Sequence, residues 1–301
     1  MPLVSMTRLL QHAMENGYAV GYFEAWNLES LLAVKDAAEQ SGSPVIIGFN
    51  GKFLGNRSRR VREDVLVYGS LGLSVASRSP VPMSLILNEA DDVALLLDGL
   101  EAGFNAIMHE GCAIESYTSI NSTLVKAAHA RGAAVEAELG ELPSGGAGAA
   151  ALGEGTRTDP GEARRFVDRT GVDALAVSVG NVHILEGRKS RLDFALLSEL
   201  RRKVPVPLVL HGGTGIDEQD LKEAIRQGVC KVNVGTVLRR TFINSLQCYL
   251  REHNVQRLDP GEVTSTGGEL DMLASARAQV AREVLRLMAV FGSTGKAAGV
   301  R

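Results

Sequence analysis

The sequence predicts a TIM barrel, a closed (β/α)8 fold, with an extra C-terminal helix. Short apolar segments alternate with amphipathic segments along the 301 residues, a rhythm typical of parallel strands joined by helices. The apolar segments are nearly continuous hydrophobic runs, as expected of strands covered on both faces. No Gly-x-Gly-x-x-Gly follows the first of them, which argues against a doubly wound dinucleotide-binding sheet. We therefore expect a single barrel domain over residues 1–301, with a helical extension over about 265–291.

The individual elements follow from local patterns. The predicted strands are 18–25, 44–50, 81–89, 106–111, 133–141, 174–181, 207–212 and 230–234. The predicted helices are 28–40, 59–77, 91–102, 114–131, 161–170, 192–203, 218–227, 237–252 and, as the C-terminal addition, 270–288. Several helices begin with a capping residue, such as Asp217 before Glu218. The C-terminal helix is a candidate for packing on a neighbouring subunit, and we expect the tail 292–301 to be loose.

Composition narrows the class of function. A net charge of −3 argues against a dedicated nucleic-acid surface. No segment approaches the roughly 18–20 apolar residues that a membrane span needs, and the first residues lack the features of a signal peptide. Three cysteines without a Cys-x-x-Cys spacing favour neither a disulfide framework nor a zinc cage. We expect a cytoplasmic protein with a small-molecule partner and no nucleic-acid or membrane partner.

Histidines close two of the predicted strands. His211 ends the run 207–211, and His183 follows the run 174–181. The carboxyl ends of barrel strands form the active site, and other ends there carry Glu24, Asn50 and Glu138. Two histidines among several carboxylates favour metal binding or acid–base chemistry over a structural role.

Glycine-rich turns follow the seventh and eighth predicted strands. The first is 212–215 and the second is 233–236. Barrels commonly bind phosphate at this position, because backbone N–H groups can approach an anion there. A further loop, 142–159, is rich in Gly and Ala. It is either an active-site lid, which its position after a strand favours, or a connector.

Further motifs occur in six segments between about residues 17 and 240. They are 43–46 (Ser-Pro-Val-Ile), 102–104 (Ala-Gly-Phe), 136–140 (Glu-Ala-Glu-Leu-Gly), 170–176 (Thr-Gly-Val-Asp-Ala-Leu-Ala), 209–216 (Val-Leu-His-Gly-Gly-Thr-Gly-Ile) and 231–234 (Lys-Val-Asn-Val). In sequence and in order, these segments resemble the motifs of the class II ketose-bisphosphate aldolases, of the fructose- or tagatose-bisphosphate type.

The third strand departs from the family pattern His-x-Asp-His-Gly. Counting back from 102–104 places the proton-transferring aspartate on Asn88 and one zinc-binding histidine on Glu89. The other two zinc histidines fall on His183 and His211. Asparagine has no titratable proton and cannot act as an acid or base, although it can orient a substrate hydroxyl or carbonyl group. A set of two histidines and one carboxylate suits zinc, and open versions also suit iron or manganese. The alternative is that Glu89 is a surface or ion-paired carboxylate and no metal binds.

Other site positions differ as well. The family asparagine after the first strand is Glu24, the serine near the end of the second strand is Asn50, and the aspartate of the Asn-Ile-Asp-Thr turn is Gly235. The fourth-strand aspartate is Glu110, which could share a second cation with Glu138. The residues that still match the region for phosphate and a monovalent cation are Gly180, Gly212, Thr214, Asn233 and Thr236.

The resemblance implies a metal-dependent, aldolase-type carbon–carbon lyase acting on a phosphorylated ketose or related sugar phosphate. Because Asn88 cannot transfer a proton, Glu24, Glu138 or Glu154 would have to do so. One alternative is a catalytically silent member that binds sugar phosphate or supports a partner enzyme. Another is an isomerisation or decarboxylation through the same enediolate. The resemblance and the C-terminal helix also imply a homodimer or homotetramer.

Overall fold

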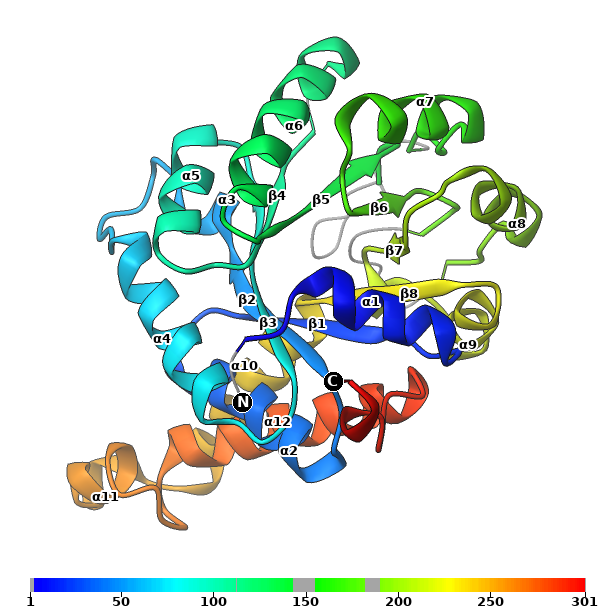
Figure 1. The fold of residues 1–301 in the computed structure, drawn as a ribbon. Coiled ribbons are helices and arrows are strands. Elements are labelled where there is room, and N and C mark those ends of the chain that lie inside the picture. The colour runs from blue at the N-terminus through cyan, green and yellow to red at the C-terminus, as the bar shows by residue number, and fades with distance from the viewer. Residues whose placement is uncertain (1–2, 112, 143–154, 182–189, 301) are drawn as a thin grey trace.

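In the computed structural model, the described residues 3–111, 113–142, 155–181 and 190–300 form a closed barrel of parallel strands in the order β1 to β8 (Figure 1). The first strand pairs with both the second and the eighth, which closes the barrel. The strands are β1 (Val20–Ala25), β2 (Val45–Asn50), β3 (Met83–Ala90), β4 (Ala106–His109), β5 (Ala134–Leu139), β6 (Ala174–Val177), β7 (Leu208–Leu210) and β8 (Val229–Val234). The predicted TIM barrel is confirmed.

Helices surround the barrel and close one of its ends. They are α1 (Met6–Glu15), α2 (Leu28–Ser41), α3 (Gly51–Leu54), α4 (Val65–Arg78), α5 (Val93–Glu101), α6 (Ile114–His129), α7 (Pro160–Thr170), α8 (Phe194–Lys203), α9 (Glu218–Arg226), α10 (Thr236–Glu252), α11 (Pro260–Thr264) and α12 (Met272–Val290). The helix predicted from residue 59 begins later, at Val65. Asp64 sets this start, because its side chain accepts a hydrogen bond from the Leu66 N–H at 2.9 Å.

The sequence analysis missed helix α1. Its apolar residues Met6, Leu9, Leu10 and Ala13 have helical spacing and pack with the small side chains inside the barrel. The side chain of Ser5 caps the helix. Helix α1 therefore closes the end of the barrel that lies opposite the strand carboxyl ends.

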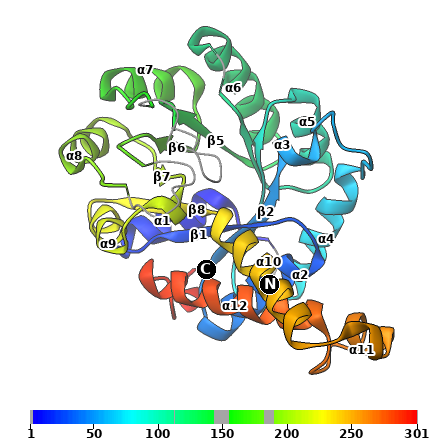
Figure 2. The ribbon, with the colours of Figure 1, turned by 180° about the vertical axis from the view of Figure 1, so that it is seen from behind.

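The C-terminal helix α12 packs on α2 and α10 of the same chain, as both ribbon views show (Figures 1 and 2). The ring of Phe291 stacks on Phe23 of β1. The expectation of a loose tail is wrong for residues 292–300, because Gly295 and Ala297 donate backbone hydrogen bonds of 2.9 Å to the end of α2. Val300 is buried. Within the described residues, no helix combines the length and apolar character that crossing a membrane requires.

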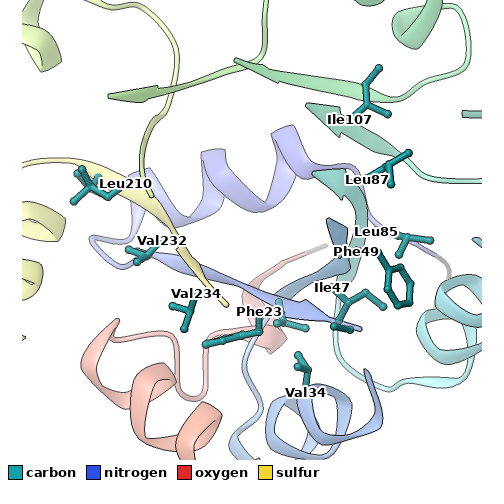
Figure 3. Packing of buried hydrophobic residues seen from close by; sticks show 14 of the residues in the cluster. Phe23, Val34, Ile47, Phe49, Leu85, Leu87, Ile107, Leu210, Val232 and Val234 are labelled. Atoms are coloured by element: carbon teal, nitrogen blue, oxygen red, sulfur yellow. The ribbon is translucent and has the colours of Figure 1, made fainter. Parts of the chain in front are cut away.

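Alternation along the strands decides which side chains enter the barrel. Phe23, Ile47 and Leu87 pack in the layer between strands and helices (Figure 3). Their strand neighbours Glu24 and Asn88 therefore point inward, although both are polar. The strands are thus apolar toward the helices and carry polar groups where the barrel opens at its carboxyl end.

Candidate active site

A fully buried ionic cluster lies at the centre of the barrel. Nε2 of His211, directly after β7, lies 2.9 Å from Oε1 of Glu136 on β5. Oε2 of the same carboxylate lies 2.8 Å from Nζ of Lys231 on β8. None of the three side chains is exposed, so each depends on the others for its polar contacts.

The charges of this cluster determine its protonation. Burial alone would lower the pKa of His211, but the carboxylates of Glu138 and Glu136 outweigh burial and raise it to about 10. Burial opposes ionisation of Glu136, yet Lys231 and His211 bring its pKa below the ordinary value. The cluster is therefore ionised, and its carboxylates strongly attract positive charge.

Glu89 enters the site through an irregularity in β3. Simple alternation from Asn88 would turn Glu89 toward the outer layer. Instead, Glu89 adopts a positive φ of 54°, which is rare for a non-glycine residue, and the pairing of β3 with β4 shifts between Leu87 and Ala90. Such a conformation costs about 1–3 kcal/mol and is typical of functional sites. It brings Oε1 of Glu89 to 3.6 Å from Nδ1 of His211.

Asn50 connects two carboxylates at the mouth of the barrel. Its Nδ2 lies 2.8 Å from Oε2 of Glu89 and 3.2 Å from Oε2 of Glu24. Glu24 also forms an ion pair with Arg239 of α10, and the guanidinium lies 4.8 Å from the ring centres of both Trp26 and Phe53. Burial raises the pKa of Glu24, and Arg239 counteracts this.

A ring nitrogen and two carboxylates, the donor types that divalent ions bind, lie close together at His211. Its Nδ1 lies 3.4 Å from Oε1 of Glu138 as well as 3.6 Å from Glu89, while Glu136 orients the other ring nitrogen. A carboxylate behind the histidine is a usual feature of metal sites. Among the described residues no group of three or more histidines, cysteines and carboxylates is positioned to hold a metal ion. The predicted ligand His183 lies outside those residues.

The predicted phosphate turns lie beside this cluster. Gly212 has a φ of 67°, a conformation that favours glycine, and a Cβ on Gly213 would lie 2.6 Å from Val232. The tight turn places Thr214 against the start of α10, where its Oγ1 lies 3.4 Å from the Val237 nitrogen. A 17-residue helix that begins here directs N–H groups and the positive end of its dipole toward the site.

A cavity of about 400 Å³ joins these parts. The predicted site residues that line it are Glu24, Asn50, Asn88, Glu89, Glu138, Gly212, Thr214, Asn233 and Thr236. Gly180 is not among the residues that line it; its φ of 103° and the close approach of the Arg191 carbonyl explain the glycine locally. Glu154 lies outside the described residues. The functional roles of all these residues stay predictions.

Three further residues of the site, Glu136, Lys231 and Arg239, received no functional role from the sequence. Glu136 and Lys231 could have been recognised, because a charged residue at an inward position of an otherwise apolar strand needs a partner in the core. No sequence pattern pointed to Arg239, since its role depends on where the first turn of α10 lies relative to β1.

Comparison with known proteins shows the family of this chain. The family described as fructose-bisphosphate aldolase class-II matches residues 4–296. The chain belongs to this family. A fructose-bisphosphate aldolase from Geobacillus stearothermophilus is 35% identical over 305 residues, covering 99% of this chain and 100% of that protein.

Two solved structures of aldolases are also similar. The YdjI aldolase from Escherichia coli K12 has a TM-score of 0.80 at 30% identity, with 98% of this chain and 99% of that chain covered. Fructose-bisphosphate aldolase from Campylobacter jejuni has a TM-score of 0.78 at 21% identity, covering 98% and 97%, and shows the shared fold. These relatives span nearly the whole class II aldolase chain described here.

Proposed function

We propose that this chain is a metal-dependent, aldolase-type lyase that cleaves or forms a C–C bond in a phosphorylated ketose or a related sugar phosphate. The observation that carries the proposal is the convergence of Glu89, Glu138 and Nδ1 of His211, from three different strand ends, beside the turn at Gly212. Glu89, His183 and His211 would hold the ion, preferably zinc. When bound, such an ion supplies a Lewis acid that polarises a carbonyl group and stabilises an enediolate.

The remaining groups of the cavity bind substrate and move protons. Thr214, Thr236 and the N–H groups at the start of α10 offer hydrogen bonds to a phosphate. Asn88, buried and inward-facing, orients a hydroxyl or carbonyl group and transfers no proton.

Glu24 is the described carboxylate best suited to proton transfer. Glu89 and Glu138 both face His211, and Glu110 is partly exposed and bound to Lys52 at 2.6 Å. Glu24 lines the cavity outside that donor set and is buried. Although Arg239 pairs with it, burial raises its pKa toward the working range of a general base.

Two measurements on the purified protein test the proposal. We expect about one divalent ion per chain by elemental analysis, and solvent-deuterium incorporation at the hydroxymethyl carbon of dihydroxyacetone phosphate. His211→Ala should abolish both. His129→Ala, which removes an exposed histidine paired with Asp173 at 3.0 Å, should change neither.

The outcomes separate the alternatives. Metal-free protein that binds the ketose phosphate without deuterium exchange would support the silent, sugar-phosphate-binding member. Exchange without C–C cleavage of any ketose phosphate would favour an isomerase or decarboxylase.

A further inference from the structure

The side chain of Asn50 is fixed at both ends of its amide. Its Oδ1 accepts a hydrogen bond of 3.2 Å from the Phe53 N–H and so caps helix α3. The NH2 end must therefore face the two carboxylates, Glu24 and Glu89, which can only accept hydrogen bonds when ionised. The orientation of the amide follows from its partners.

This orientation determines where the Glu89 carboxylate points. Oε2 is held by Asn50 at 2.8 Å, which leaves Oε1 directed at Nδ1 of His211, 3.6 Å away. The backbone of Glu89 is in a left-handed conformation at the end of a strand, where a carboxylate without such a bond could adopt other rotamers.

The resemblance places an asparagine, a serine and a histidine at positions 24, 50 and 89. In this chain Glu24, Asn50 and Glu89 stand there, and they form one hydrogen-bonded group. A serine at position 50 has one donor and a shorter side chain, so it could not bridge both carboxylates.

We propose that Asn50 is a positioning residue that aims the Glu89 carboxylate at the metal site. Asn50 acts through Glu89, and its second hydrogen bond holds the Glu24 carboxylate beside it. Both hydrogens of the amide are used by the protein, one toward Glu89 and one toward Glu24. This inference rests on the proposed function, because it presumes that the ion binds at Glu89 and His211.

The test measures zinc affinity by competition with a chromophoric chelator, without an activity assay. Asn50→Ser keeps an N-cap acceptor and the net charge but loses the bridge. We expect it to weaken zinc binding by about 10- to 100-fold, the usual effect of losing a group that orients a ligand. In a Glu89→Ala background the same substitution should have no further effect, because its route to the ion is gone.

A matched control separates positioning from helix capping. Asp64→Ala removes the cap of α4, far from the cavity, and should lower the melting temperature without changing zinc affinity. The visible spectrum of the cobalt-substituted protein should change for Asn50→Ser and stay unchanged for Asp64→Ala.

The results distinguish the two levels of inference. Unchanged zinc affinity in Asn50→Ser, or an equal loss with and without Glu89, would overturn the positioning role while leaving the proposed function intact. A wild-type protein that binds no zinc, manganese or iron would overturn the proposed metal site and this inference with it.

Discussion

Gly235 leaves open the space beside the Glu24 carboxyl group. A Cβ at position 235 would lie 3.3 Å from both Cδ and Oε2 of Glu24. The φ of Gly235 is −132°, which other residues also adopt, so the contact with Glu24 is what a side chain at this position would have to accommodate. The resemblance places an aspartate at this position and an asparagine at position 24. In this chain the acidic side chain beside position 235 is Glu24 of β1, whereas the turn after β8 has none at Gly235.

Gly235→Asp should therefore conflict with Glu24. We expect the substitution to lower the free energy of unfolding by about 1–3 kcal/mol through crowding and charge repulsion. In a Glu24→Asn background the cost should be smaller, giving a measurable coupling in urea unfolding. Gly111→Asp adds the same charge where a Cβ would meet no atom within 4 Å, and serves as the control. An equal loss of unfolding free energy with Glu24 and with Asn at position 24 would show that positions 24 and 235 are not coupled.

Arg239→Gln should make stability depend more strongly on pH. Burial already raises the folded-state pKa of Glu24 above the ordinary value of 4.5, and Arg239 is the main group that lowers it again. Without Arg239 the folded protein holds this proton to higher pH than the unfolded chain does. The free energy of unfolding should match wild type below pH 4.5 and fall behind it as the pH rises.

Urea unfolding between acidic and neutral pH measures this difference, which we expect to reach about 1–3 kcal/mol. Arg277→Gln removes an arginine of similar exposure from its pair with Asp36 in the helix layer, whose carboxylate is more exposed than that of Glu24. That variant should show a small, nearly pH-independent loss, and a similar profile for both variants would contradict the prediction.

Lys231→Met should be strongly destabilising. The substitution conserves volume but removes the ammonium group from Glu136, which is fully buried and keeps His211 as its remaining cationic partner. Breaking a buried pair in this way costs about 3–5 kcal/mol. Adding Glu136→Gln should recover part of the loss, since an amide is cheaper to bury than an unpaired carboxylate. Chemical denaturation of the single and double variants provides the measurement.

Tyr22→Phe should separate stability from ligand binding. The hydroxyl group of Tyr22 is buried, lines the cavity and has no hydrogen-bond partner among the described residues. Removing it should leave the free energy of unfolding unchanged or slightly higher. The ring remains over the Lys231 ammonium group, 5.1 Å from its centre. A group held in the cavity for substrate would show its role as weaker sugar-phosphate binding, measured by calorimetry.

Much of the fold could be read from local patterns. The apolar runs ending at Asn50, Asn88 and His211 correspond to β2, β3 and β7, because strands covered on both faces must be apolar throughout. Helix α1 was missed, although Ser5 and the spacing from Met6 to Ala13 were visible. It was overlooked because it precedes the first strand and belongs to no βα repeat.

The barrel, the strand-end positions and the residue types that face the cavity can be predicted from the amino-acid sequence, since strand alternation and the order of elements are local properties of the chain. The inward turn of Glu89 is visible only in the folded molecule, because its positive φ and the register shift break the alternation from which its direction would be inferred. The contacts of Asn50 with Glu24 and Glu89, and the pairing of Glu136 with His211 and Lys231, likewise join residues from different strands. Barrel closure alone brings such residues together, so their mutual dependence is a property of the folded molecule.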